Sequence, residues 1–333
     1  MGGPPEARCL LERRQAGGRH VLGSPPPAQR RNGRGRTDRA PEQDVAHTAA
    51  PLPVRHATIV RMLICTLGDL VLDVIVRLEG PFTPGDDTAA ATHVGAGGQA
   101  ANVAAWATAL GADARLLTRR GHDNAAELAV REVAARGVEI LGPVTGEPGG
   151  VVVSVVGPDG ERSMLTDRGP APGLRADEIY VRWLRGADVL HLSGYALLGG
   201  AITEAGARAA GAARTQGARI SVDLASAEGI RASGPGRVRA RLRQLEPDTV
   251  FAGEHEIAAL GEEPPASTLV LKHGAGGVTV AQDGDRERRA AASVEVVDPT
   301  GAGDALAAGF LVGWIELGLE AAARCLATMG AMP

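Results

Sequence analysis

The chain has 333 residues, of which 44% are hydrophobic and only 2% aromatic, and its formal net charge is −4. This length suits one large or two medium domains with a core of small aliphatic side chains. The slightly acidic balance gives no broad attraction to nucleic acid or anionic lipid, so we expect neither as a partner. We also expect no apolar stretch to reach the roughly 18 residues of a membrane span.

The three cysteines, Cys9, Cys65 and Cys325, are far apart and form no CxxC pair. This usage predicts a reducing compartment without disulfides. The layout of a secretory signal peptide is also missing at the N-terminus. We therefore expect a cytoplasmic protein.

Residues 1–61 differ in composition from the rest of the chain. They hold 11 arginines against five acidic residues, together with the run Pro25–Pro27, and they lack hydrophobic periodicity. Such a segment is expected to be disordered. The favoured interpretation is a mis-assigned start, with Met62 as the natural one, because a strand pattern begins there at once. The alternative is a basic arm that binds RNA or directs targeting.

From Met62 onward, short apolar runs alternate with amphipathic stretches. The order predicts an α/β domain over 62–333 with a mostly parallel, buried sheet. The predicted strands are 63–67, 114–118, 189–192, 220–223, 250–252, 268–272 and 278–281, and the predicted helices are 102–110, 127–136 and 202–216.

Two stretches interrupt this alternation. Residues 74–94 have a strand-like composition around the turn Pro84-Gly85-Asp86, and residues 151–168 begin VVVSVV and then turn at Gly157-Pro158-Asp159-Gly160. Both have the residues of antiparallel turns. They predict a small β lid over one end of the domain, where ligands of open α/β sheets bind.

The segment Gly95-Ala-Gly97-Gly98-Gln-Ala100 fits the dinucleotide fingerprint G-x-G-x-x-A. That fingerprint must follow the first strand directly, whereas a long non-helical stretch intervenes here. Binding of NAD is therefore disfavoured. The chain also lacks the G-x-x-x-x-G-K-[ST] sequence of P-loop proteins.

The pair Gly97 and Gly98 leaves room for a ligand to approach the backbone, and Asn102 follows in the first turn of a predicted helix. Asn102 either contacts the ligand or caps its helix. Because the chain has only three asparagines, we favour ligand contact. Asp69 and Asp73, which follow the first strand, either hold sugar hydroxyls or lie in a solvated turn.

The sequence Asp298-Pro-Thr-Gly301-Ala302-Gly303-Asp304 precedes an apolar run. Its three small residues leave backbone N–H groups free at a helix start, which favours an anion such as phosphate. An acid at such a site either caps the helix or has a chemical task. Asp304 is predicted to accept the proton of an attacking hydroxyl while the N–H groups stabilise a transferring phosphoryl group.

Together these residues resemble the ribokinase-like (PfkB-type) carbohydrate kinase family. The N-terminal signature is similar to Gly97-Gly98-Gln-Ala-Ala-Asn102 and Gly121-His-Asp123, and the C-terminal signature is matched by residues 298–304. The resemblance implies a ribokinase-like three-layer sandwich and an ATP-dependent kinase that phosphorylates a hydroxymethyl group of a sugar.

The resemblance also implies roles for single residues. Asp304 would be the catalytic base beside an anion hole of Gly301, Ala302 and Gly303. The acceptor would contact Asp73, Gly97, Gly98 and Asn102, whereas ATP would lie along Lys272, Gly274 and Gly277. Glu256 would support Mg²⁺ through water, and Asp298 would help to bind a monovalent cation such as K⁺.

One departure concerns the metal, because Gly253 stands where the family often has Asn, three residues before Glu256. The resemblance also implies a partner, namely a second copy of the chain bound through the lid. The sequence leaves two alternatives open, a nucleoside kinase of the same fold and a non-catalytic sugar-binding sensor.

Overall fold

The computed structural model describes residues 61–333, so the expectations for residues 1–60 lie outside the described part. The described part is built around a nine-stranded sheet in the order β13-β12-β11-β10-β9-β8-β1-β4-β5. Its strands are β1 (Leu63–Leu67), β4 (Asp113–Leu117), β5 (Glu139–Leu141), β8 (Val189–Ser193), β9 (Arg219–Asp223), β10 (Thr249–Gly253), β11 (Thr268–Lys272), β12 (Val278–Gln282) and β13 (Asp285–Arg289).

Seven of these nine strands are joined by parallel pairing, and the only antiparallel pairings in this sheet are those of β12 with β11 and with β13 at one edge. The carboxyl ends of β1, β8, β9, β10 and β11 therefore meet at one edge of the sheet. In open α/β sheets this edge is where ligands bind. The prediction of a mostly parallel sheet is confirmed.

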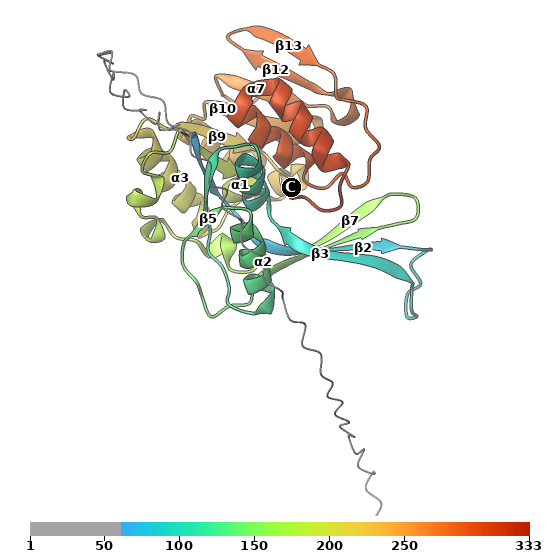
Figure 1. The fold of residues 1–333 in the computed structure, drawn as a ribbon. Coiled ribbons are helices and arrows are strands. Elements are labelled where there is room, and N and C mark those ends of the chain that lie inside the picture. Colours follow the sequence, from blue (N-terminus) through green and yellow to red (C-terminus); the bar gives the residue numbers. More distant parts are fainter. Residues whose placement is uncertain (1–60) are drawn as a thin grey trace, which may run out of the picture. The chain divides into compact units, whose positions relative to one another are not determined.

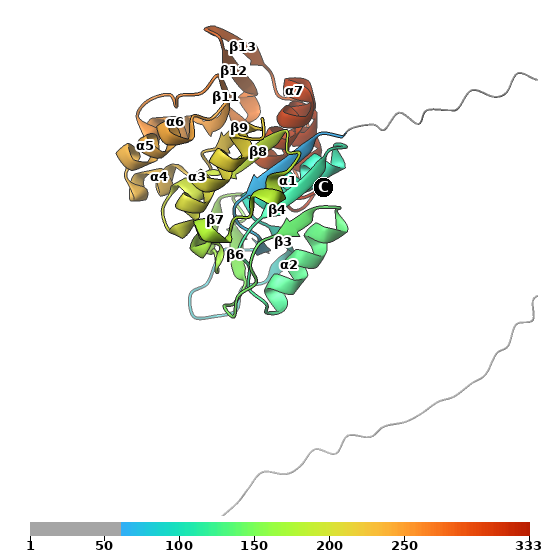
Figure 2. The ribbon, with the colours of Figure 1, turned by 90° about the vertical axis from the view of Figure 1, so that its left-hand side faces the viewer.

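Helices cover both faces of the sheet, as Figures 1 and 2 show. One face carries α1 (Gln99–Ala109), α2 (Asn124–Ala135) and α7 (Ala302–Leu326), and the other carries α3 (Ala201–Arg214), α4 (Ala227–Ser233), α5 (Pro235–Leu245) and α6 (Glu254–Leu260). Neighbouring strand residues alternate between the two cores, as Ile64 and Cys65 or Leu116 and Leu117 do. Successive side chains of a strand point to opposite faces of the sheet, so each strand contributes to both cores. The sheet therefore lies between two layers of helices, which is the expected three-layer sandwich.

The predicted strands and helices all occur, with ends shifted by up to three residues. The sequence analysis missed β5, β13, α4, α5 and α6. Strands β5 and β13 lie at the two edges of the sheet, and every residue of β13 is exposed. Edge strands with exposed residues lack the apolar run by which buried strands were recognised.

A second, four-stranded sheet in the order β3-β2-β6-β7 projects from the core (Figure 1). It consists of β2 (Val71–Leu78), β3 (Ala90–Gly97), β6 (Gly150–Val156) and β7 (Arg162–Asp167). Both predicted antiparallel pairs are present, β2 with β3 and β6 with β7. The sequence did not reveal that β2 pairs in parallel with β6, which joins the two pairs into one sheet.

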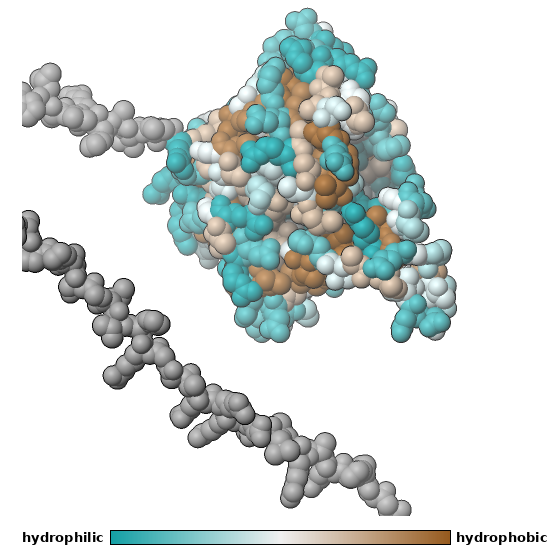
Figure 3. Space-filling view, turned by 45° about the vertical axis from the view of Figure 1, so that its right-hand side comes forward, coloured by the Kyte–Doolittle hydropathy of each residue, from teal (hydrophilic) through white to brown (hydrophobic). Residues whose placement is uncertain are grey.

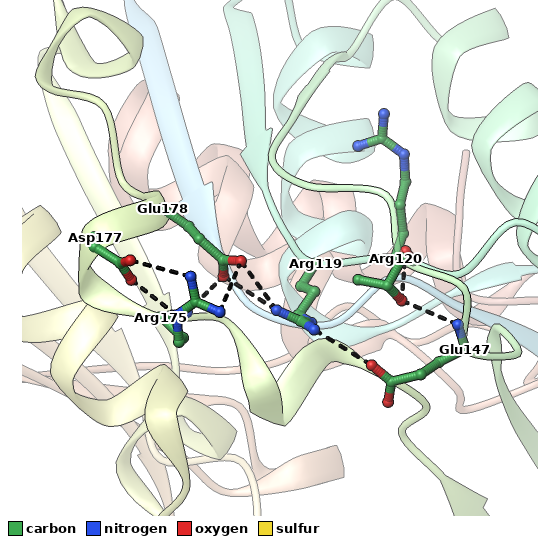
Figure 4. Close-up of polar contacts among 7 residues, drawn as sticks. Arg119, Arg120, Glu147, Arg175, Asp177 and Glu178 are labelled. Atoms are coloured by element: carbon green, nitrogen blue, oxygen red, sulfur yellow. Dashed lines mark hydrogen bonds and ion pairs between the residues drawn. The ribbon is translucent and has the colours of Figure 1, made fainter.

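Arg119, just after β4, forms ion pairs with the segment that precedes β6 and with the segment that follows β7 (Figure 4). Its guanidinium contacts Glu147, which precedes β6, at 3.3 Å and Glu178, which follows β7, at 3.0 Å. Arg175 and Asp177 extend the network by a charge-assisted contact of 2.9 Å. Because Arg119 and Glu178 each expose only 17% of their side chains, the base of the small sheet is fixed to the core.

Helix α7 corrects one expectation, because its 25 residues are long and apolar enough to cross a membrane by length and composition. The backbone leaves the helical conformation at Gly313 and Trp314, however, and the chain folds back. A Cβ atom on Gly309 would lie 2.5 Å from the Leu317 carbonyl oxygen, so the two halves touch. Each half is too short to span a bilayer, and 56% of the apolar window is buried.

Candidate active site

The start of α7 requires glycine at position 301. Gly301 has a φ of +79°, and a Cβ atom there would lie 2.6 Å from Cβ of Ala331. A residue with a side chain would be strained by both the backbone conformation and the contact. Gly303 is different, because its Cβ would lie 3.6 Å from the Lys272 Nζ in ordinary contact. The helix begins at Ala302, which leaves its first N–H groups without partners inside the helix.

Asp304 lies in the first turn of α7 but does not cap that helix with its side chain. Its Oδ2 instead accepts a hydrogen bond of 2.7 Å from Nδ2 of Asn102. Burial raises the pKa of Asp304 to about 7, with contributions from Asp223 and Asp73 that the Asn102 hydrogen bond and Lys272 oppose. A carboxylate with such a pKa can accept a proton near neutral pH. The capping interpretation of Asp304 is wrong.

Asn102 lies in the first turn of α1, where only 5% of the residue is exposed. The N-cap of that helix is Gly98, with no side-chain capping bond, so Asn102 is not the cap either. Its Nδ2 is engaged with Asp304, and its Oδ1 is buried without a hydrogen-bond partner in residues 61–333. A buried acceptor without a partner is costly, and this atom is able to accept a hydrogen bond from a ligand.

The glycine pair before α1 allows two close approaches. Gly98 has a φ of +101°, and a Cβ atom on it would lie 2.4 Å from the Asp69 carbonyl oxygen. A Cβ on Gly97 would lie 2.0 Å from Oδ2 of Asp73. Burial raises the pKa of Asp73 to about 6, an effect that Arg162 opposes and Asp298 increases. The two glycines therefore make room for acidic residues of the β1–β2 region.

These residues enclose a cavity of about 220 Å³ at the carboxyl end of β1, under the small sheet. Four of the predicted site residues, Asp73, Gly98, Asn102 and Asp304, line it, whereas Gly97 does not appear on its wall. Tyr195, which follows β8, lines it too and was not predicted from the sequence. No motif pointed to Tyr195, although it is one of only two tyrosines in the chain.

Strand β7 forms one wall of this cavity. The residues that line it are alternate ones along the strand and just past its end, namely Arg162, Met164, Thr166 and Arg168. Arg168 donates two hydrogen bonds to Asp69, at 2.6 and 2.8 Å, and lies over the Tyr195 ring. The strand period of two predicts such a common face, but the sequence analysis had used β7 only as a lid.

A second cavity of about 640 Å³ lies on the other side of residues 299–303. Its wall includes three of the predicted nucleotide-binding residues, Lys272, Gly274 and Gly277, together with Ala302 and Gly303. Gly277 has a φ of +88°, and a Cβ there would lie 2.0 Å from the Arg289 carbonyl oxygen. Most of the remaining wall is aliphatic, from residues 291–296 and α7. This size and lining suit a small organic ligand.

Lys272 is held in place by Asp223, which the sequence analysis had placed only at the end of the predicted strand 220–223. The Lys272 Nζ donates to both carboxylate oxygens of Asp223, at 2.9 and 2.7 Å. Burial alone would lower the pKa of Lys272, but Asp223 outweighs it and raises the pKa. Lys272 therefore carries its positive charge at the wall of the larger cavity.

The two predicted metal residues do not lie in one cluster. Oε2 of Glu256 accepts a 2.6 Å hydrogen bond from the Gly253 N–H, at the start of α6. Asp298 accepts hydrogen bonds from Thr300 and from the Gly330 N–H, which outweigh its burial and lower its pKa. Within residues 61–333, no group of three or more His, Cys, Asp or Glu residues could hold a metal ion.

Comparison with known proteins assigns the chain to a family. Residues 61–332 match the pfkB family of carbohydrate kinases, and the chain belongs to this family. It is 31% identical over 278 residues to the ATP-dependent ribose-1-phosphate kinase of Halopiger xanaduensis, covering 79% of this chain and 90% of that protein. It is 30% identical over 271 residues to an Escherichia coli fructokinase, covering 76% and 85%.

Solved structures share the fold. An adenosine kinase of Sinorhizobium meliloti superposes with a TM-score of 0.72 at 24% identity, covering 82% of this chain and 96% of the other. A protein assigned as ribokinase II of E. coli, solved with ATP and Mg²⁺, has a TM-score of 0.69 at 21% identity and covers 81% and 94%. The predicted ribokinase-like fold is confirmed.

The raised pKa of Asp304 predicts a pH-dependent gain in stability for Asp304→Asn. The pKa is about 7 in the folded protein against an ordinary value of 3.8, so between these values the folded protein binds a proton that the unfolded chain has lost. The stabilisation is fully present below about pH 4 and is lost as pH rises through about 7. The Asn variant never ionises and should be more stable at pH 8, by on the order of 1–4 kcal/mol.

Thermal unfolding of the wild type and Asp304→Asn at pH 4.5 and pH 8 tests this. The difference in Tm between the two proteins should be small at the lower pH and should grow at the higher one. A Tm difference that stays the same at both pH values would contradict the raised pKa.

Proposed function

We propose that this protein is an ATP-dependent kinase that transfers the γ-phosphoryl group to a hydroxymethyl group of a sugar or sugar-like molecule. The proposal rests mainly on one observation. Residues 299–304 separate the two cavities, with Asp304 and Gly301 facing the smaller one and Ala302 and Gly303 facing the larger one. A hydroxyl on one side and a phosphate on the other can therefore meet at the start of α7.

In the proposed reaction the acceptor hydroxyl binds beside Asp304 and gives its proton to that carboxylate. The hydroxyl oxygen then bonds to the γ-phosphorus as the bond from that phosphorus to the β–γ bridging oxygen breaks, which releases ADP. The N–H groups of Gly301, Ala302 and Gly303 would stabilise the negative charge on the transferring group, aided by the positive end of the α7 dipole.

The acceptor would be held by the polar groups of the smaller cavity. The unpartnered Oδ1 of Asn102 would accept a hydrogen bond from a sugar hydroxyl, and Asp73 would accept others. Gly97 and Gly98 would contribute by letting the backbone and these side chains approach the sugar. The small sheet of β2, β3, β6 and β7 would act as the lid that excludes water.

ATP would occupy the larger cavity, with its phosphates directed to the start of α7. Lys272 supplies a positive charge there, and Gly274 and Gly277 bring the backbone to the cavity wall. The aliphatic remainder of the wall suits the adenine ring. The presence of ATP and Mg²⁺ in the E. coli ribokinase II structure supports this assignment.

Mg²⁺ fits this site only in part. It commonly takes few protein ligands and keeps several waters, so the missing carboxylate cluster does not exclude it. Glu256 would support the ion through water, but its carboxylate now bonds to the Gly253 N–H. A monovalent cation such as K⁺ would bind beside Asp298, through lone pairs that Thr300 and Gly330 leave free. When bound, Mg²⁺ would neutralise charge on the ATP phosphates.

Two alternatives fit the same fold. A nucleoside kinase would place a nucleobase in the smaller cavity, where the Tyr195 ring offers a stacking surface, and one structural relative is an adenosine kinase. A non-catalytic sugar sensor would bind ligands without turnover. An ADP-release screen over sugars, sugar phosphates and nucleosides separates these functions, because a sensor would release no ADP with any of them.

Asp304→Asn tests the catalytic assignment. Asn keeps the size of the side chain and can accept the hydrogen bond from Asn102, but it cannot take a proton. We expect kcat to fall by roughly 10²–10⁴, the usual contribution of a general base, while the affinity for ATP is retained. Asp113→Asn, at the amino end of β4, is the matched control and should leave kcat unchanged. Near-normal kcat in folded Asp304→Asn would overturn the mechanism.

Gly253→Asn tests the role of Glu256. A Cβ atom at position 253 would lie 2.4 Å from Oε2 of Glu256, so the flexible carboxylate must leave its bond to the backbone. The released carboxylate and the new amide should together lower the Mg²⁺ concentration at half-maximal rate severalfold. Gly253→Ala is the control that releases Glu256 without adding an amide. If neither variant changes the Mg²⁺ requirement, Glu256 does not act near the metal.

We also propose that the cytoplasmic enzyme is a dimer joined through the lid. Apolar surface forms several separate patches on the face drawn in Figure 3. Among the exposed apolar residues are Val94 on β3 (45% exposed) and Leu165 on β7 (64% exposed). Leu165 does not line the cavity.

Light scattering should give twice the chain mass for the wild type and the single mass for Leu165→Lys. A monomeric wild type would refute the dimer.

A further inference from the structure

The smaller cavity contains a guanidinium group that the proposed reaction does not use. We propose that Arg162 binds an anionic group of the acceptor, so that the substrate is a sugar that already carries a phosphate or a carboxylate. This inference rests on the proposed kinase function, and it goes further by naming the substrate class and the residue that selects it.

The position of Arg162 follows from strand β7. Arg162 is the first residue of that strand, where it pairs with Val156 of β6, and it lines the cavity with Met164 and Thr166 from the same face. The same cavity reaches Asp304, and Arg162 itself contacts Thr300 in the loop that leads to Asp304. A sugar that places its reacting hydroxyl at Asp304 therefore has the lid strand over its remaining groups.

The two arginines of this wall differ in their pairing. Arg168 is neutralised by two short hydrogen bonds to the carboxylate of Asp69. Arg162 makes one hydrogen bond, in which Nη1 donates to Oγ1 of Thr300 at 2.6 Å, and no carboxylate of residues 61–333 forms an ion pair with it. A guanidinium group has five N–H donors in a planar fork that fits phosphate and carboxylate. Most of the donors of Arg162 are therefore available to a ligand.

The acidic residues of the cavity fix the direction in which an anionic sugar can bind. Asp304 on α7 and Asp73 on β2, which β6 separates from β7, lie on other walls of the cavity and would repel a phosphate or carboxylate. Arg162 is the one cation of the described cavity wall that no acidic residue pairs. An anionic acceptor would thus bind with its charge at Arg162 and its free hydroxyl at Asp304, which is the orientation that transfer requires.

Arg162 could instead act only as a latch for the lid. Its bond to Thr300 joins β7 to the loop before α7, and Arg77 of β2 makes a similar link, with Nη2 donating to the Val297 carbonyl oxygen at 2.9 Å. Arg77 does not line the cavity. It is therefore the matched control, because its loss would loosen the lid without removing a cation from the cavity.

The test measures binding by calorimetry without ATP, so that it does not depend on turnover. The probes are the matched pairs ribose and ribose 1-phosphate, fructose and fructose 1-phosphate, and glucose and gluconate, which separate phosphate from carboxylate. Wild-type protein should bind the anionic member of at least one pair tenfold or more tightly than the neutral one. Arg162→Gln should abolish that preference, and Arg162→Lys should restore part of it.

Arg77→Gln should weaken both members of the preferred pair by the same factor and keep the preference. The proposal is overturned if no anionic probe binds more tightly than its neutral counterpart. It is also overturned if Arg162→Gln and Arg77→Gln have the same effect on both members, since Arg162 would then be a latch. A preference that depends on Arg162 in a protein that never releases ADP would support this inference and reject the kinase function.

Discussion

The hydrogen bond between Asn102 and Asp304 joins the first turns of α1 and α7, 202 residues apart in the chain. It holds a carboxylate at a helix start, where N–H groups without partners inside the helix attract anions. Without this bond the Asp304 carboxylate could turn to its own N–H groups and cap the helix. In the proposed mechanism, the bond thus keeps Asp304 turned to the smaller cavity as the base and leaves the backbone of residues 301–303 for phosphate.

The remaining structure supplies the surroundings of this pair. Parallel strands bring Asp69, Asp223 and Lys272 to one edge of the sheet, and the glycines at 98 and 301 permit the close backbone contacts there. The raised pKa of Asp304 is the energetic consequence, because a buried carboxylate beside other acids is costly to ionise. If Asp304 is the base as proposed, its burial lowers the stability of the protein and in return gives a carboxylate that can accept a proton near neutral pH.

Much of what was predicted about the strands and the site came from local sequence patterns. Apolar runs revealed the buried strands, the glycines with their neighbouring polar residues pointed to Asp304 and Asn102, and the family resemblance pointed to Lys272. The sequence could not show that Gly253 lets Glu256 bond to its own helix start, or that Asp223 holds Lys272, because both depend on side-chain conformations in the folded chain. Arg162 and Arg168 could have been found from the period of β7, once its cavity face was known.

The most direct test of the central claim is the pH dependence of kcat/KM for the acceptor in the wild type and in Asn102→Ala. This ratio reports the pKa of the essential base in the free enzyme. The wild-type rate should fall below a midpoint near pH 7, and the midpoint should move to higher pH in the variant, because Asp304 loses the hydrogen bond that favours its charged form. An acid limb with the same midpoint in both proteins would contradict the account.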